Sequence, residues 1–102
     1  MRYTILFSSQ AEDDLLALRA TDRAKVLDTI EIHLRYEPDK ESKSRIKRLQ
    51  GYRWPRYRLR IDEIRTFYDI FYEEEEGVVE ILAILEKAAA MKWLAEHGIS
   101  EE

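Results

Sequence analysis

The chain lacks cysteine, which excludes a disulfide framework and any thiolate metal site and is typical of proteins in a reducing compartment. Glycine and proline are also scarce, with three and two among 102 residues, so the composition is not that of a flexible or disordered chain. The longest purely apolar run covers residues 81–85, far fewer than a membrane span requires, and no apolar leader opens the chain. We therefore expect one globular domain, residues 1–102, located in the cytoplasm and without a membrane partner.

Charge is distributed unevenly along the chain. Seventeen basic and 21 acidic residues give a net charge of −4 and a pI near 5.3, which argues against a general nucleic-acid-binding protein. Residues 40–60, however, hold nine basic residues and one acidic residue, a net charge of +8 that leaves −12 on the other 81 residues. One basic zone on an acidic body indicates an anion-binding surface.

The first third of the chain predicts a strand and two helices. Apolar residues alternate over residues 2–7, which indicates a strand. Ser9 and Glu12 form a capping box for a helix that runs to about residue 18. Thr21 or Asp22 caps a second helix, which ends near residue 36 because Pro38 disfavours a helical residue before it. We expect these helices to form an αα-hairpin.

The rest of the chain reads mostly as strands. A polar loop over residues 39–44 precedes a short strand near residues 46–50, which Gly51 and Pro55 interrupt. Residues 56–61, 64–72 and 78–85 have the alternation or apolar content of strands, and residues 88–97 predict a helix that ends at Gly98. The order β-α-α-β-β-β-α predicts an α+β domain, with the helical hairpin packed on a mainly antiparallel sheet.

Arginines occupy alternate positions of the strand over residues 56–61. Arg56, Arg58 and Arg60 therefore share one face, while the apolar residues between them face the helices. We expect a four-residue loop after this strand, because residues 62–63 suit a two-residue type I′ turn poorly. This register places Arg60 opposite Arg65, Arg58 opposite Phe67 and Arg56 opposite Asp69.

The arginine face predicts binding of single-stranded RNA. Like charges directly across a ladder are destabilising unless they face water or share an anion. Same-face arginines lie roughly 7 Å apart, close to the spacing of successive phosphates in an extended strand, and Phe67 offers a ring on which a base can stack. We expect Lys47, Arg48, Arg56 and Phe67 to contact RNA. The alternative is a solvated face whose charge is neutralised by the domain's own carboxylates, among them Asp62, Glu63 and Asp69.

Two segments, LQG over residues 49–51 and YRLRIDEIRTFYDI over residues 57–70, resemble the RelE/ParE superfamily of bacterial toxins from type II toxin–antitoxin systems. The opening strand followed by FSSQA (residues 7–11) and the glycine-terminated last helix are also similar. The resemblance covers nearly the whole chain, and the stretch of residues 57–69 is its most specific part. It implies a compact fold like that of microbial ribonucleases and a cognate antitoxin that silences the toxin.

The resemblance also implies site residues and two different activities. RelE-type members cut mRNA in the ribosomal A site, whereas ParE-type members poison DNA gyrase. The basic residues of the RelE cleft map onto four positions that we expect to be catalytic: Arg58, Arg60, Arg65 and Lys87. The family's catalytic tyrosine falls near Met91 or Trp93, and neither side chain can replace it chemically.

The base for RNA cleavage is harder to assign. Glu86 is the carboxylate that we consider, although it and Lys87 equally fit the polar start of a helix. His33 and His97 lie on helices, away from the expected site.

We expect a toxin that acts as a metal-independent, cofactor-free, ribosome-dependent mRNA endoribonuclease and inhibits translation. The alternatives are a ParE-like toxin directed at gyrase, an inactive member that acts by binding protein or nucleic acid, and an RNA-binding module without toxicity. The expected partners are the ribosome, mRNA and an antitoxin segment, disordered when free, that places acidic residues near the arginines in a toxin–antitoxin hetero-oligomer. No metal site is expected, because the run Glu73–Glu76 reads as a solvated loop.

Overall fold

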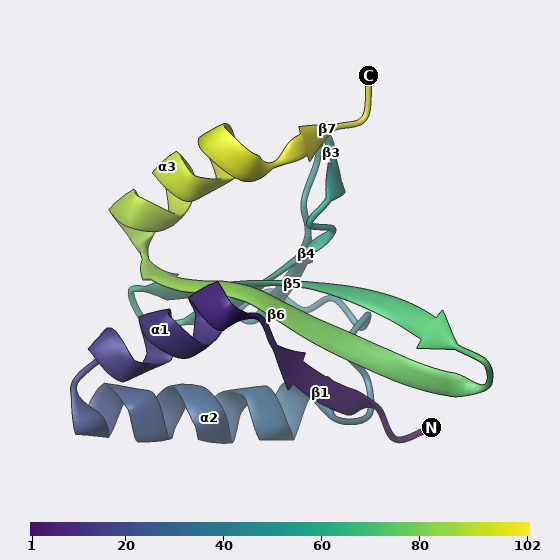
Figure 1. Cartoon of the computed structure of the whole chain (residues 1–102), viewed down its shortest axis with the longest axis horizontal. Coiled ribbons are helices and arrows are strands. Elements are labelled where there is room, and N and C mark those ends of the chain that lie inside the picture. Colours follow the sequence, from purple (N-terminus) through teal and green to yellow (C-terminus); the bar gives the residue numbers. More distant parts are fainter.

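The structure, a computed structural model, describes residues Met1–Glu102 and contains three helices and two sheets (Figure 1). In chain order the elements are β1 (Thr4–Phe7), α1 (Ser9–Ala17), α2 (Ala20–Leu34), β2 (Ile46–Arg48), β3 (Tyr52–Trp54), β4 (Tyr57–Ile61), β5 (Ile64–Glu73), β6 (Glu76–Glu86), α3 (Lys87–His97) and β7 (Ile99–Ser100). None of the helices combines the length and apolar character needed to cross a membrane.

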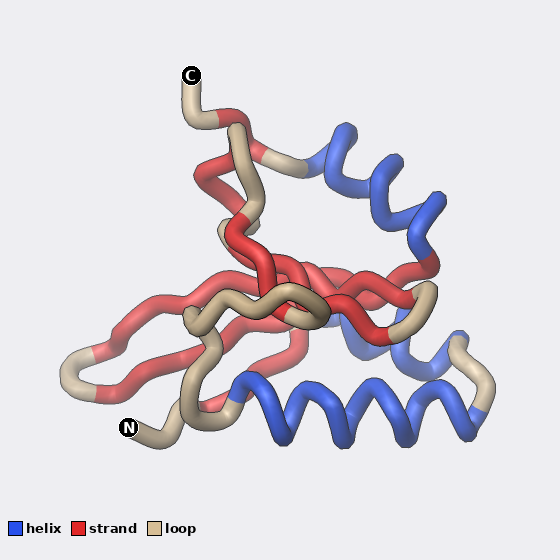
Figure 2. Tube along the Cα trace, turned by 180° about the vertical axis from the view of Figure 1, so that it is seen from behind, coloured by secondary structure: helices blue, strands red, loops and turns tan.

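The main sheet has five strands in the order β1-β6-β5-β4-β2. The outer strand β1 runs parallel to β6, and every other neighbouring pair is antiparallel, which confirms the predicted α+β class. The helices α1 and α2 lie against one face of this sheet and α3 lies over the other, so the sheet is the middle of three layers (Figures 1 and 2).

The helical hairpin forms where it was predicted, with shifted caps. The N-cap of α1 is Ser8, one residue before the expected position; its Oγ accepts from the Ala11 amide at 3.0 Å and donates to the Leu82 carbonyl at 3.1 Å. The second bond ties the cap to β6, a tertiary contact that the local pattern does not contain. The helix α2 starts at Ala20 after Arg19, which has no capping side-chain bond, so Thr21 and Asp22 lie inside the helix.

The β4–β5 turn is shorter than predicted. Ile61 pairs directly with Ile64, so residues 62 and 63 form a two-residue turn rather than a four-residue loop. Asp62 takes a positive φ of 52°, which aspartate tolerates better than most residues. The Lys25 ammonium donates to the Asp62 carboxylate and holds this turn against α2.

Two short strands were missed by the sequence analysis. β3 and β7 pair antiparallel in a second sheet, with Tyr52 opposite Ser100 and Trp54 opposite Ile99. Elements of two or three residues are too short to show alternation, so the sequence offered no signal for them. Their pairing ties the segment after α3 to the segment between β2 and β4 (Figure 1).

The hydrophobic core has two parts, one on each face of the sheet. The larger part lies under α1 and α2 and includes Val26, Ile30 and Leu34 of α2 together with the inward-facing residues of β4 to β6. The smaller part lies under α3 and contains Phe67, Leu82, Ala83, Ala90, Trp93 and Leu94. The second face of the sheet is therefore half covered by α3, and the arginines occupy what remains of it.

Candidate anion-binding site

The arginine face forms in the predicted register. Leu59 and Ile61 of β4 are buried in the larger core, which turns Arg58 and Arg60 to the opposite face. Arg60 pairs with Arg65 of β5 and Arg58 with Phe67, as expected. Three arginines thus meet where β4 and β5 approach their connecting turn.

Arg65 is the most buried member of this group, with 7% of its surface exposed. Its guanidinium donates to the Asp62 carbonyl at 2.7 Å and to the Ile64 carbonyl at 3.2 Å, so it fastens the β4–β5 turn. No carboxylate lies within ion-pair distance of it. A buried guanidinium is normally compensated by an acid, so its positive charge remains available to an anion.

Arg58 is half-buried and incompletely satisfied. Its Nε is buried and has no hydrogen-bond partner in the protein. Burial, and then the positive charges of Arg65 and Arg60, lower the pKa of the Arg58 guanidinium. An anion that accepted a hydrogen bond from Arg58 would relieve both effects.

The domain's own carboxylates do not neutralise this group. The Asp69 carboxylate accepts from Arg56 Nε at 2.6 Å, and the Asp62 carboxylate is occupied by Lys25 on the α2 side of the sheet. Arg58, Arg60 and Arg65 form no ion pair. The alternative of an internally neutralised face therefore holds for Arg56 alone. We call the three unpaired arginines the arginine cluster.

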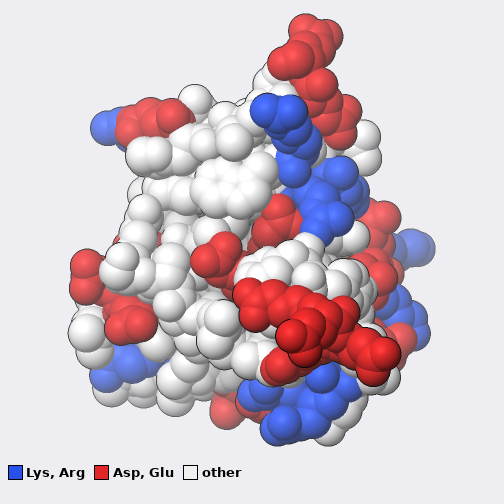
Figure 3. All heavy atoms as spheres, turned by 45° about the vertical axis from the view of Figure 1, so that its right-hand side comes forward, with Lys and Arg blue, Asp and Glu red and all other residues white.

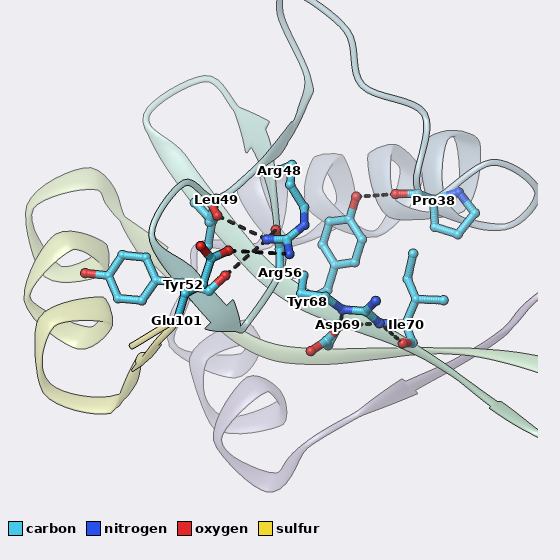
Figure 4. Close-up of polar contacts among 9 residues, drawn as sticks. All are labelled: Pro38, Arg48, Leu49, Tyr52, Arg56, Tyr68, Asp69, Ile70 and Glu101. Atoms are coloured by element: carbon cyan, nitrogen blue, oxygen red, sulfur yellow. Dashed lines mark hydrogen bonds and ion pairs between the residues drawn. The ribbon is translucent and has the colours of Figure 1, made fainter.

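Two arginines expected to bind RNA also contact other parts of the protein (Figure 4). One guanidinium nitrogen of Arg48 lies 3.1 Å from the carbonyls of Leu49 and Tyr52 and 3.4 Å from that of Arg56, and another lies 4.0 Å from Glu101. Arg56 is held by Asp69 and by the Ile70 carbonyl. Backbone carbonyls of a loop surround the Arg48 guanidinium, and no sequence pattern predicts partners of this kind. Both guanidinium groups thus have partners within the protein and are only partly exposed, and their contact with RNA stays a prediction.

Phe67 was predicted to stack on a base, and the structure contradicts this. The side chain is 1% exposed and stacks on Trp93 of α3, with ring centroids 5.4 Å apart. Trp93, near which the family resemblance places a catalytic tyrosine, is itself buried and donates its Nε1 hydrogen to Gln10 at 3.0 Å. An indole in this role fixes α3 on the sheet and cannot exchange a proton with a substrate.

The remaining predicted residues lie at the rim of the site. Lys87 is the first residue of α3 and is exposed, and its backbone amide donates to the Glu63 carbonyl at 2.9 Å. Glu86, also exposed, lines a shallow hollow together with Glu63, Lys87 and Met91. Lys47 is exposed and pairs across the ladder with Arg58, so it extends the positive surface toward the edge strand β2.

The longest acidic run of the chain lies away from this site, at the other end of β5. Glu73 to Glu76 are exposed at the tip of the β5–β6 hairpin. Figure 3 shows acidic groups gathered over the lower part of one face of the molecule, with basic groups beside them. No group of three or more His, Asp or Glu side chains is arranged to hold a metal ion. The unpaired guanidinium groups of the arginine cluster are suited to bind a phosphate by charge and hydrogen bonds.

Comparison with known proteins gives structural matches only. No protein-family model and no curated protein sequence matches the chain. Among solved structures, it is similar to the toxin–antitoxin complex RelBE2 from Mycobacterium tuberculosis, with a TM-score of 0.59 and 26% identity over 84% of this chain and 99% of that chain. It is also similar to the archaeal RelE–RelB complex from Pyrococcus horikoshii OT3, with a TM-score of 0.66 and 25% identity over 85% of this chain and 97% of that chain.

A third structure, the YoeB/ParE toxin from Agrobacterium tumefaciens, matches with a TM-score of 0.63 and 17% identity over 81% of this chain and 97% of that chain. At this identity the match supports the fold alone. Together the three matches confirm the fold that the sequence resemblance predicted.

Proposed function

We propose that this member of the RelE/ParE superfamily is the toxin of a type II toxin–antitoxin system and acts in the cytoplasm as a metal-independent endoribonuclease on ribosome-bound mRNA. The observation that carries the proposal is the arginine cluster. Arg65 is buried without a carboxylate, and the Nε of Arg58 is buried without a partner. A fold retains such uncompensated charge at a cost in stability, which a bound phosphate would offset.

The geometry supports a role for the cluster in the transition state of RNA cleavage. Without a metal, the ribose 2′-hydroxyl loses its proton and attacks phosphorus, and the 5′-oxygen leaves and takes up a proton. Arg58 and Arg60 would bind the non-bridging phosphate oxygens and stabilise the negative charge that grows on them. Lys87, exposed at the start of α3, is our candidate proton donor, and Glu86 beside it our candidate base.

A second candidate function is a ParE-like or catalytically inactive toxin that acts by binding a protein such as gyrase. The missing tyrosine favours it, because the family position falls near Met91 or Trp93 and neither side chain can exchange protons. In that case the arginine cluster would bind an acidic protein segment rather than RNA.

We propose in either case that a cognate antitoxin binds the chain. Two of the similar structures are complexes of a toxin with its antitoxin. A segment rich in Asp and Glu would pair with Arg58 and Arg60, which have no acidic partner of their own. The antitoxin would then silence the toxin by occupying the phosphate site.

Inducible expression with and without the adjacent open reading frame, followed by primer extension on a translated mRNA, tests the proposal. We expect growth arrest with new 5′ ends inside the reading frame, and rescue when the neighbouring gene is co-expressed. Arrest without new ends would support the gyrase-directed alternative, and absence of arrest would contradict a toxin.

Substitutions should show whether cleavage requires the arginine cluster in particular or positive surface charge in general. Arg58→Gln and Arg60→Gln should abolish cleavage, while Arg19→Gln, which removes a charge from the start of α2 where the side chain is 87% exposed, should not. Arg65→Ala is a less clean probe, because Arg65 also holds the β4–β5 turn.

A further inference from the structure

A shallow groove runs along the outer edge of β2, beside the arginine cluster. It is lined by Glu41, Ser42, Lys43, Lys47, Arg48 and Gln50, none of them apolar. Lys47 and Arg58 are ladder partners, so their side chains share one face of the sheet. The groove therefore continues the positive surface of the arginine cluster past the last strand of the sheet.

Ser42 presents a proton donor to this groove. Its Oγ accepts from the backbone amides of Arg45 at 3.1 Å and Ile46 at 3.2 Å. A hydroxyl oxygen has two lone pairs and one hydrogen, and both lone pairs are used here. The hydrogen is thus left to donate, and a phosphate oxygen is a suitable acceptor.

The charges lining the groove are three basic and one acidic. Glu41, the acid, is turned to the backbone, where its Oε1 accepts from the Arg48 amide at 2.8 Å. The Arg48 guanidinium is bound to carbonyls, as described above. Lys43 and Lys47 are exposed and form no ion pair, so they are the charges free to meet a ligand.

We propose that this groove is a second phosphate subsite, formed by Ser42, Lys43 and Lys47, for the same single-stranded RNA whose scissile phosphate the arginine cluster binds. The inference rests on the proposed function. Neighbouring strands lie about 4.8 Å apart, so the outer edge of β2, the strand next to β4, lies roughly 5–10 Å from Arg58, a distance of about one nucleotide. The RNA backbone would cross the sheet from β4 to β2, rather than follow one strand.

Dependence of binding on RNA length tests the subsite. The probes are 2′-O-methylated oligouridines, which cannot be cleaved through a 2′-hydroxyl: a dinucleotide, whose single phosphate can occupy the arginine cluster but not both sites, and a decamer, which reaches both. The variant Lys43→Ala/Lys47→Ala should weaken binding of the decamer about ten-fold at 0.1 M salt and reduce the slope of log K against log salt by about 0.7, the value for one phosphate contact. It should leave binding of the dinucleotide within two-fold, as measured by NMR titration.

The matched control removes two lysines that lie outside the groove. Lys40 and Lys92 each pair with a glutamate at 3.6 and 3.9 Å and are 72% and 80% exposed. Lys40→Ala/Lys92→Ala should change neither affinity by more than two-fold. An equal loss of affinity for the dinucleotide and the decamer in the groove variant would mean that the lysines act by general electrostatic attraction, and it would overturn the subsite.

The proposed function can fail separately. If Arg58→Gln abolishes binding of both probes and the groove variant behaves like the control, the subsite alone is wrong. If the wild-type protein binds neither probe, the RNA-directed function and the subsite both fall.

Discussion

Replacing Arg58 by methionine should stabilise the isolated protein. Methionine keeps the length and the apolar stem of the side chain and removes its charge and donors. The wild-type Nε is buried without a partner, and neighbouring positive charges act on the same guanidinium. A mutation that removes a predicted catalytic group is thus expected to raise the free energy of unfolding.

The structure sets the size of the effect. Leaving a buried donor unsatisfied costs about 1–3 kcal/mol, and the half-buried position of Arg58 favours the lower end. Repulsion between same-face charges roughly 7 Å apart adds about 0.6 kcal/mol in water, and more where the dielectric is lower. We expect a gain of about 1–2 kcal/mol, or about 4–8 °C in melting temperature for a domain of this size.

Urea unfolding in chloride and in phosphate buffer of equal ionic strength measures this gain. Phosphate should stabilise the wild-type protein by about 1.4 kcal/mol at ten times its dissociation constant and should affect Arg58→Met less, so the difference between the two proteins narrows. Arg19→Met, at an exposed position, should stay within about 0.5 kcal/mol of wild type in both buffers. A destabilised Arg58→Met protein, or a gain that phosphate leaves unchanged, would refute the argument that this charge is kept for an anion.

The remaining predictions concern groups that serve the fold. Arg48→Ala should lower the free energy of unfolding by about 2 kcal/mol in urea titrations, because three carbonyls lose a charged donor, whereas Glu101→Ala should cost less than about 1 kcal/mol. The hydrogen bond with Tyr72, and then burial, raise the pKa of Tyr3 to about 12, and burial raises that of Tyr68 further. Both folded pKa values lie above the unfolded value of about 10. The contribution of the two neutral tyrosines to the free energy of unfolding is therefore complete below pH 10 and is lost as the pH rises through 12. Absorbance titration should therefore show two of the six tyrosines ionising only at or after alkaline unfolding.

The arginine face was predictable because it depends on local geometry. Strict alternation with buried Leu59 and Ile61 determines where Arg58 and Arg60 point, and the two-residue turn and the expected four-residue loop both give the pairing of Arg60 with Arg65. The resemblance to the RelE/ParE superfamily also rests mainly on residues 57–69, so the same stretch led to the prediction of the fold.

The roles that were predicted wrongly depend on distant segments. Phe67 is buried only because α3 returns over the sheet and places Trp93 on its ring. The contacts of Arg48 with carbonyls of a loop and with the chain end, beside a two-strand sheet too short to be visible in the sequence, were likewise not predictable. In the sequence, a basic residue that binds a backbone carbonyl cannot be distinguished from one that binds a phosphate. Only the tertiary structure distinguishes the two.

The basic residues of the zone over residues 40–60 differ in whether they have partners within the protein. Arg48 and Arg56 are satisfied internally and hold β3 and the start of β4 in place, which keeps the neighbouring surface rigid. Arg58, Lys47 and Lys43 lack acidic partners, because Asp69 is bound to Arg56 and the Glu41 carboxylate to a backbone amide. The few acids near the zone are thus committed to structural contacts, and the positive charge remains in a continuous path from the β4–β5 turn to the outer edge of β2. A surface required only for solubility has no need of such an arrangement, whereas a site for a polyanion requires both the unpaired charges and the rigid support beneath them.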